Sequence, residues 1–140
     1  MNIDIGTIAI LVVITHIIQI AVFTHQYRTN KTYKGIGWWL AWSCFLAAGI
    51  SIFVMRSVVD LPKIFAVFQN VLIVSGTLFI YIGFMKFLGR KENKLTLLLI
   101  FGFFIVPFLY FLFIEDAIRF RSGIINAALA FIAFFTVISF

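Results

Sequence analysis

The most charged stretch of this chain, "FIEDAIRFRSG" at residues 113–123, lies between two apolar runs. It carries two acids, Glu115 and Asp116, and two arginines, Arg119 and Arg121. Side chains of both signs at this spacing can take part in a site that binds a ligand, or they can form only a polar hairpin. Which of the two applies depends on the elements that position them and on the polar residues that those elements bring nearby.

Composition decides which solvent surrounds the chain. Of its 140 residues, 64% are hydrophobic and 11% are charged, and the mean hydropathy is +1.15. A water-soluble domain of this length could not cover so much apolar surface with so few polar residues. The sequence therefore predicts an integral membrane protein, with the lipid bilayer as its main partner.

Five apolar runs are each about 20 residues long, the length that a helix needs to cross a ~30 Å hydrocarbon core. They cover residues 5–24, 35–55, 64–85, 95–114 and 122–140. The connections are too short for a soluble domain, so consecutive helices are expected to be antiparallel neighbours. The predicted fold class is all-α: residues 1–140 form a single transmembrane domain, an integral membrane bundle of five transmembrane helices. The last run lacks the basic flank that usually ends a span, so we expect a piece of a longer chain.

Basic residues gather in the first and third connections, which hold seven of the eleven: Arg28, Lys31, Lys34, Lys86, Arg90, Lys91 and Lys94. The other connections hold four, and three acids dilute them. The positive-inside rule then predicts that the N-terminus is outside and the C-terminus is cytoplasmic. Because anionic lipid headgroups account for the net charge of +6, we expect no nucleic acid partner.

With this orientation, the polar residues can be assigned a depth. Gln69 and Asn70 would lie ~8–9 Å below the outer face at ~1.5 Å per residue, and Asn126 would be shallower still. The residues expected in the outer third of the bundle are Arg56, Gln69, Asn70, Glu115, Asp116, Arg119, Arg121 and Asn126. They are candidates for an outward-facing pocket that binds a ligand. The alternative is that the charges extend into the headgroups and the amides only join helices.

His16 and Gln19 are expected near the middle of the first helix, one turn apart. A proton-linked role is conceivable for His16, and a packing histidine is the alternative. His25 is nine residues away and about half a turn out of phase, so the two histidines cannot share one metal ion. The three tryptophans, Trp38, Trp39 and Trp42, favour a belt at the membrane interface over a cofactor site.

Small residues recur along three of the runs, and in lipid such rows favour close helix contacts. The second run has Gly37, Ala41, Cys44, Ala48 and Ser51, the third has Gln69, Gly76 and Gly83, and the fifth has Gly123, Ala127 and Ala130. We expect these rows to meet in the bundle interior, which would leave the phenylalanines largely to lipid.

Motifs for catalysis do not occur in the sequence. It has no glycine-rich phosphate loop, no metal-ligand spacing and no nucleophile beside a base. We therefore expect a module that is not an enzyme by itself, with no metal and no cofactor.

Residues 35–90 resemble the N-terminal membrane sensor regions of bacterial diguanylate cyclases and sensor histidine kinases. The shared features are Gly37, Trp38 and Trp39, then Arg56, Pro62, Asn70 and Gly83, and the turn "FLGR" at residues 87–90. The resemblance implies a multi-pass protein of the bacterial inner membrane and a homodimer in the full-length protein. It also implies a cytoplasmic output domain, a cyclase or a kinase, which this chain does not contain.

The sequence thus favours a non-catalytic sensor module for two-component or cyclic-di-GMP signalling. It would bind a small molecule, lipid or protein at its outer side and control an output domain on the cytoplasmic side. One alternative is a small transporter or channel that is complete as it stands, supported by a file of polar residues from the outer cluster toward His16 and Gln19. Another is a structural subunit of a larger membrane complex.

Overall fold

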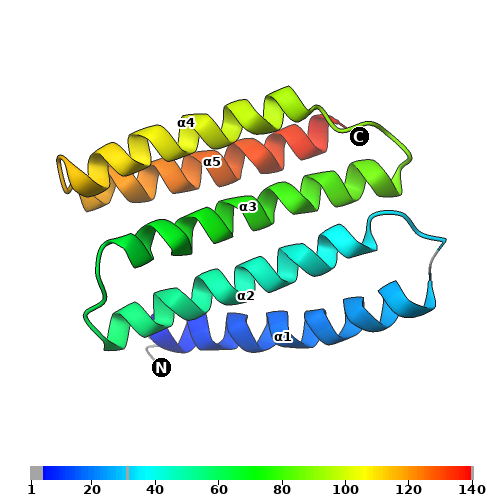
Figure 1. Cartoon of the computed structure of the whole chain (residues 1–140), viewed down its shortest axis with the longest axis horizontal. Helices are drawn as coiled ribbons and strands as arrows, with labels where there is room; N and C mark the ends of the chain where they lie inside the picture. The colour runs from blue at the N-terminus through cyan, green and yellow to red at the C-terminus, as the bar shows by residue number, and fades with distance from the viewer. Residues whose placement is uncertain (1–4, 31, 140) are drawn as a thin grey trace. The chain divides into compact units, whose positions relative to one another are not determined.

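The computed structural model describes residues 5–30 and 32–139. The described chain is helical, with α1 Ile5–Thr29, α2 Ile36–Val58, α3 Ile64–Phe87, α4 Lys94–Phe113 and α5 Ile118–Ile138 (Figure 1). All five helices are long and apolar enough to cross a membrane. The predicted all-helical class, with five helices able to cross a membrane, is therefore confirmed, while the predicted topology and orientation stay predictions.

Two helices differ clearly from the runs predicted for them. α1 continues to Thr29 instead of ending at residue 24, and α5 begins at Ile118 instead of residue 122. An apolar run marks the part of a helix that fits hydrocarbon, whereas backbone hydrogen bonding continues into the headgroup region, where charged side chains are solvated. Arg119 and Arg121 consequently belong to the first turn of α5 and not to a loop.

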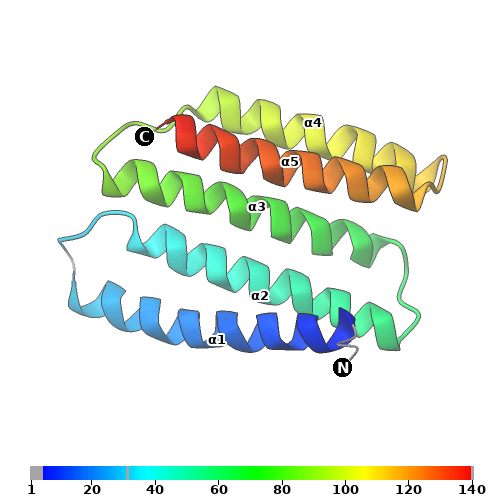
Figure 2. The ribbon, with the colours of Figure 1, turned by 180° about the vertical axis from the view of Figure 1, so that it is seen from behind.

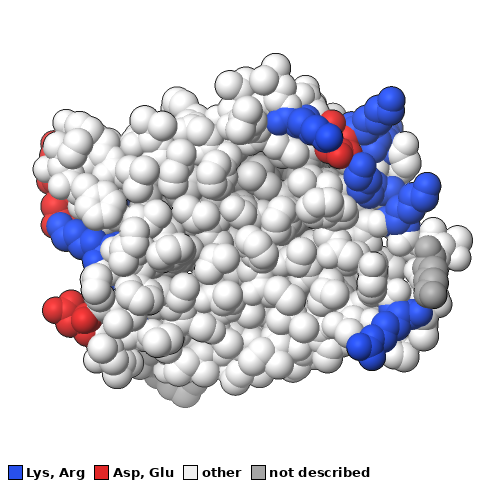
Figure 3. Space-filling model, viewed as in Figure 1, with Lys and Arg blue, Asp and Glu red and all other residues white. Residues whose placement is uncertain are grey.

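The chain divides into two compact units, Met1–Arg90 and Lys91–Phe140. In the first, here called the N-terminal unit, α2 contacts both α1 and α3. In the second, the C-terminal hairpin, α4 and α5 pack against each other in antiparallel directions (Figures 1 and 2). On the face drawn in Figure 3, the charged side chains lie at helix ends, and the long surface between them is uncharged.

Glycines bring α2 and α3 close together at three levels. A Cβ added at Gly49 of α2 would lie 3.0 Å from the backbone oxygen of Gln69. One added at Gly76 of α3 would lie 3.2 Å from the Cβ of Phe45, and one at Gly83 would overlap the indole of Trp39. Small residues on one helix therefore leave room for backbone or aromatic rings of the other.

The expectation that the rows of small residues meet is wrong for the row in α2. Cys44 and Ala48 of that row are exposed. Gly37 lies against α1, and a Cβ added there would be 3.2 Å from the ring of Tyr27. The glycines of α3 instead contact the bulky side of α2. A glycine on α3 leaves room for a bulky side chain of α2, so the two helices pack closely without small residues facing each other.

Candidate functional site

Arg56 and Gln69 connect the adjacent ends of α2 and α3. Arg56 lies in the last turn of α2 and is half-buried, while Gln69 lies near the start of α3 and is 7% exposed. The Nη1 of Arg56 donates a hydrogen bond of 2.9 Å to the Oε1 of Gln69. A neutral amide therefore holds the charge of the arginine where the two helices meet.

Asn70 is the next residue along α3 and is also 7% exposed. Its Nδ2 donates a hydrogen bond of 2.8 Å to the backbone oxygen of Ala66, one turn earlier in the same helix. Its amide group is thus used locally on α3. Arg56 approaches the amide of Gln69. The backbone rotation of about 100° per residue separates this amide from that of Asn70.

The charged stretch of the opening sequence forms the turn of the C-terminal hairpin. The Nη1 of Arg121 lies 3.1 Å from the Oδ1 of Asp116, and the two side chains are 16% and 55% exposed. Asp116 has a φ of +46°, in the left-handed region that aspartate tolerates better than most residues. Glu115, Arg119 and Asn126 are exposed.

The candidate residues therefore fall into two groups. Arg56, Gln69 and Asn70 belong to the N-terminal unit, whereas Glu115, Asp116, Arg119, Arg121 and Asn126 belong to the C-terminal hairpin. Within each group the structure places a charged residue beside a polar partner. A single outward pocket formed by both groups stays a prediction.

A second polar cluster lies in the middle of α1 and α2. His16 is 7% exposed, and its ring meets the edge of Trp42 with a centroid distance of 5.5 Å and an angle of 84°. Gln19 accepts a long hydrogen bond of 3.4 Å at its Oε1 from the hydroxyl of Ser43, which is fully buried. The structure thus pairs both of the polar residues singled out in the first helix with residues of α2.

Sequence reasoning missed Ser43 and the inward position of Trp42. A lone serine in an apolar run resembles any small packing residue, and the sequence did not distinguish Trp42 from Trp38 and Trp39. The Nδ1 of His16 and the Nε1 atoms of Trp39 and Trp42 are buried without a hydrogen-bond partner among the described residues. An imidazole nitrogen and an indole N–H close together can bind one water molecule or one proton-carrying group between them.

A hollow of about 320 Å³ lies at the other end of the N-terminal unit. It is lined by Gln26, Asn30, Tyr33, Ile36, Trp39 and Phe87. The rings of Tyr33 and Phe87 stack with centroids 6.0 Å apart, and Trp39 adjoins Phe87 at 5.5 Å. The aromatic rings therefore join the start of α2 to the end of α3.

Among the described residues, no three His, Cys, Asp or Glu side chains lie close enough to share a metal ion. Comparisons with protein-family models, with curated proteins and with solved structures find no match to this chain. The resemblance to bacterial sensor regions therefore rests on the residues quoted for it.

Proposed function

We propose that this protein is a non-catalytic membrane sensor module, in which the contact between Arg56 and Gln69 receives the signal. The observation that carries the proposal is the hydrogen bond of 2.9 Å between a charged side chain and a neutral amide on adjacent helix ends. Polar groups in a membrane are costly and tend to mark functional sites. The pattern of residues 35–90 supports the same function, in the inner membrane of a bacterium.

A ligand with a carboxylate or phosphate group would compete with Gln69 for Arg56. Hydrogen bonds to a charged acceptor are roughly twice as strong as those between neutral groups, so an anion would displace the amide. The ends of α2 and α3 would then be joined through the ligand or released from each other. A difference of about 1–3 kcal/mol between the two arrangements is enough to transmit a signal.

The glycine contacts between α2 and α3 would convert this release into movement. Gly49 places α2 against the backbone of Gln69, so the contact point lies immediately beside the proposed switch. Farther along the same pair of helices, Trp39 packs against Gly83 and Phe84, and the latter ring is 5.4 Å away. Rotation about the close contact would shift the far end of α3, where a cytoplasmic output domain would respond.

The experiment measures the separation of the two helix ends. Spin labels on Ser57→Cys and Ile64→Cys, two exposed positions, are introduced after replacing the exposed Cys44 by serine. The full chain is placed in lipid nanodiscs, and inorganic phosphate and acetate serve as anionic probes. We expect either probe to broaden or shift the distance distribution, and we expect Arg56→Gln to show the altered distribution without a probe.

The matched variant Gln69→Leu removes the acceptor and keeps the charge, so it should also give the altered distribution and should still respond to the anions. A distribution that is the same in the unaltered protein, in Arg56→Gln and in Gln69→Leu would show that the hydrogen bond controls no helix position, which would end the sensor proposal.

The cluster around His16 favours a second candidate, a small transporter or channel. Its support is the buried imidazole of His16, whose Nδ1 has no hydrogen-bond partner among the described residues, beside the paired Gln19 and Ser43. Purified protein in liposomes with an entrapped pH indicator would then conduct protons, and His16→Leu would abolish the flux. Absence of flux in the unaltered protein would remove this candidate and leave the sensor proposal untouched.

A further inference from the structure

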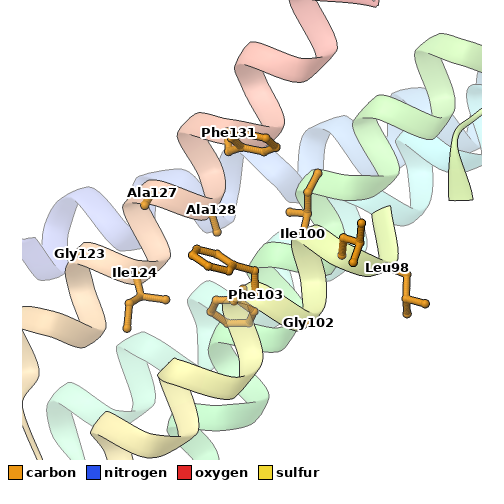
Figure 4. A pocket seen from close by; sticks show the side chains of 11 residues that line it. Leu98, Ile100, Gly102, Phe103, Gly123, Ile124, Ala127, Ala128 and Phe131 are labelled. Carbon is orange, nitrogen blue, oxygen red and sulfur yellow. The ribbon is translucent and has the colours of Figure 1, made fainter. Parts of the chain in front are cut away.

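An apolar groove of about 800 Å³ lies between α4 and α5 of the C-terminal hairpin (Figure 4). All of its lining residues are apolar or glycine, and they include Gly102 and Phe103 of α4 and Gly123, Ala127, Ala128 and Phe131 of α5. Its volume is within the range of about 300–1,000 Å³ that is usual for sites of small ligands. The groove is thus large enough for a substantial ligand and offers it no polar partner.

Small residues keep the groove open. A Cβ added at Gly102 or Gly123 would meet no atom within 4 Å, so the space beside both residues is unoccupied. Phe103 and Phe131, which are 82% and 53% exposed, flank it (Figure 4). Unlike the glycines between α2 and α3, these glycines do not bring two helices together, and their small size must be explained by something else.

The surroundings of the hairpin limit what can fill the groove. Both α4 and α5 are long and apolar enough to cross a membrane, so the groove would open into hydrocarbon. Water does not occupy an apolar cavity that gives it no hydrogen bonds. An acyl chain is the flexible apolar molecule that a bilayer supplies at every such surface.

The charged residues at the α4–α5 turn indicate which headgroup the lipid in the groove would carry. Arg119 precedes Gly123 by one helical turn on nearly the same stripe of α5, and helical side chains lean toward the N-terminal end. Arg119 therefore lies between the groove residue Gly123 and the α4–α5 turn. Glu115 lies in that turn, while Asp116 and Arg121 already pair with each other at 3.1 Å.

Arg119 and Glu115 have no side-chain partner among the described residues, and both are exposed. One unpaired positive and one unpaired negative group at the end of an apolar groove complement a headgroup that carries both signs. We propose that the groove holds an acyl chain of a zwitterionic phospholipid, whose phosphate binds Arg119 and whose ammonium group binds Glu115. This site uses other residues than the proposed signal contact and does not depend on it.

The experiment measures lipid retention by the full chain. Protein is equilibrated with equal amounts of phosphatidylethanolamine and phosphatidylglycerol, and native mass spectrometry counts the lipids that remain bound. We expect one retained phosphatidylethanolamine in the unaltered protein. Gly123→Leu adds an apolar side chain beside the groove at a position where a Cβ meets no atom within 4 Å. It should lower retention at least about tenfold, the loss that excluding two methylene groups from an apolar site produces.

Ala130→Leu is the matched control, because Ala130 is exposed on α5 and does not line the groove. It should retain the lipid, and Gly102→Leu should repeat the loss from the opposite helix. Arg119→Gln should weaken binding of both lipids, whereas Glu115→Gln should remove the preference for phosphatidylethanolamine. Circular dichroism confirms that each variant keeps its helix content.

Two results would overturn the proposal. Equal retention by Gly123→Leu and Ala130→Leu would mean that lipids cover the hairpin without a defined site. A dimer that Gly123→Leu converts to a monomer would mean that a helix of a second copy fills the groove.

Discussion

The Nη1 of Arg56 at the end of α2 donates a hydrogen bond of 2.9 Å to the Oε1 of Gln69 near the start of α3. A carboxylate at this place would hold the guanidinium more strongly, because an ion pair adds charge attraction to the hydrogen bond. The amide of Gln69 accepts a hydrogen bond from Arg56, but an anionic acceptor could replace it. A ligand can therefore change this contact, because the hydrogen bond is strong enough to form and weak enough to be displaced.

Gln69→Leu should lower the free energy of unfolding by about 1–3 kcal/mol, because the half-buried guanidinium of Arg56 loses its partner. Gln69→Glu should raise it, since the new carboxylate pairs with the same group. Denaturation in detergent micelles measures both. Ser57→Ala is the control for a change at the exposed end of α2 and should have a small effect. If Gln69→Leu is as stable as the unaltered protein, the hydrogen bond contributes nothing to the fold.

Gly83→Ala should destabilise the N-terminal unit by about 1–3 kcal/mol, because the added methyl group overlaps the indole of Trp39 in a tightly packed contact. Gly102→Ala is the matched substitution in α4, where an added Cβ meets no atom within 4 Å. It should be neutral or stabilising by up to about 1 kcal/mol, since alanine favours the helix more than glycine. Thermal unfolding measures the stability of the two variants. An equal change in stability for both would contradict the prediction.

The number and rough position of the helices could be predicted from the sequence because each apolar run is a local property. Their ends could not, because α1 and α5 continue past the apolar runs and include the charged residues Arg28 and Arg119. The depth given to Asn126 depended on that boundary. It lies eight residues after the first residue of α5, so it is about 12 Å along the helix from its start, at 1.5 Å per residue.

The face that each helix presents to its neighbour was harder to predict. In water a polar stripe identifies the outer side of a helix, but in lipid both sides are apolar and shape decides the contact. Residue size along one helix alone does not show that Trp39 packs against Gly83 or that Cys44 is exposed. Arg56 and Gln69 were expected at one level because a short loop joins α2 and α3, whereas their direct pairing depends on helix rotation.

His16→Leu should leave the stability of the N-terminal unit unchanged or raise it. His16 is 7% exposed and its Nδ1 has no described partner, so the imidazole brings a desolvation cost that leucine avoids. Trp42 would keep an apolar neighbour of similar size. Thermal unfolding in micelles measures the change. A loss of more than about 2 kcal/mol would indicate that the imidazole makes a polar contact, such as one through a buried water molecule.

The orientation of the chain determines which side of the membrane the Arg56–Gln69 contact faces. Seven of the eleven basic residues lie in the first and third connections, and the positive-inside rule assigns those to the cytoplasm. A phosphatase reporter that is active only outside should be active when inserted within residues 114–117 and inactive when fused after residue 140. A fluorescent reporter that folds only in the cytoplasm should give the reverse result. Replacing Lys86, Arg90, Lys91 and Lys94 by glutamine should weaken this preference, because it removes the excess of basic residues in the first and third connections on which the rule acts. An outside reporter that is active after residue 140 in the unaltered chain would place Arg56 and Gln69 on the cytoplasmic side, where they could not receive an external signal.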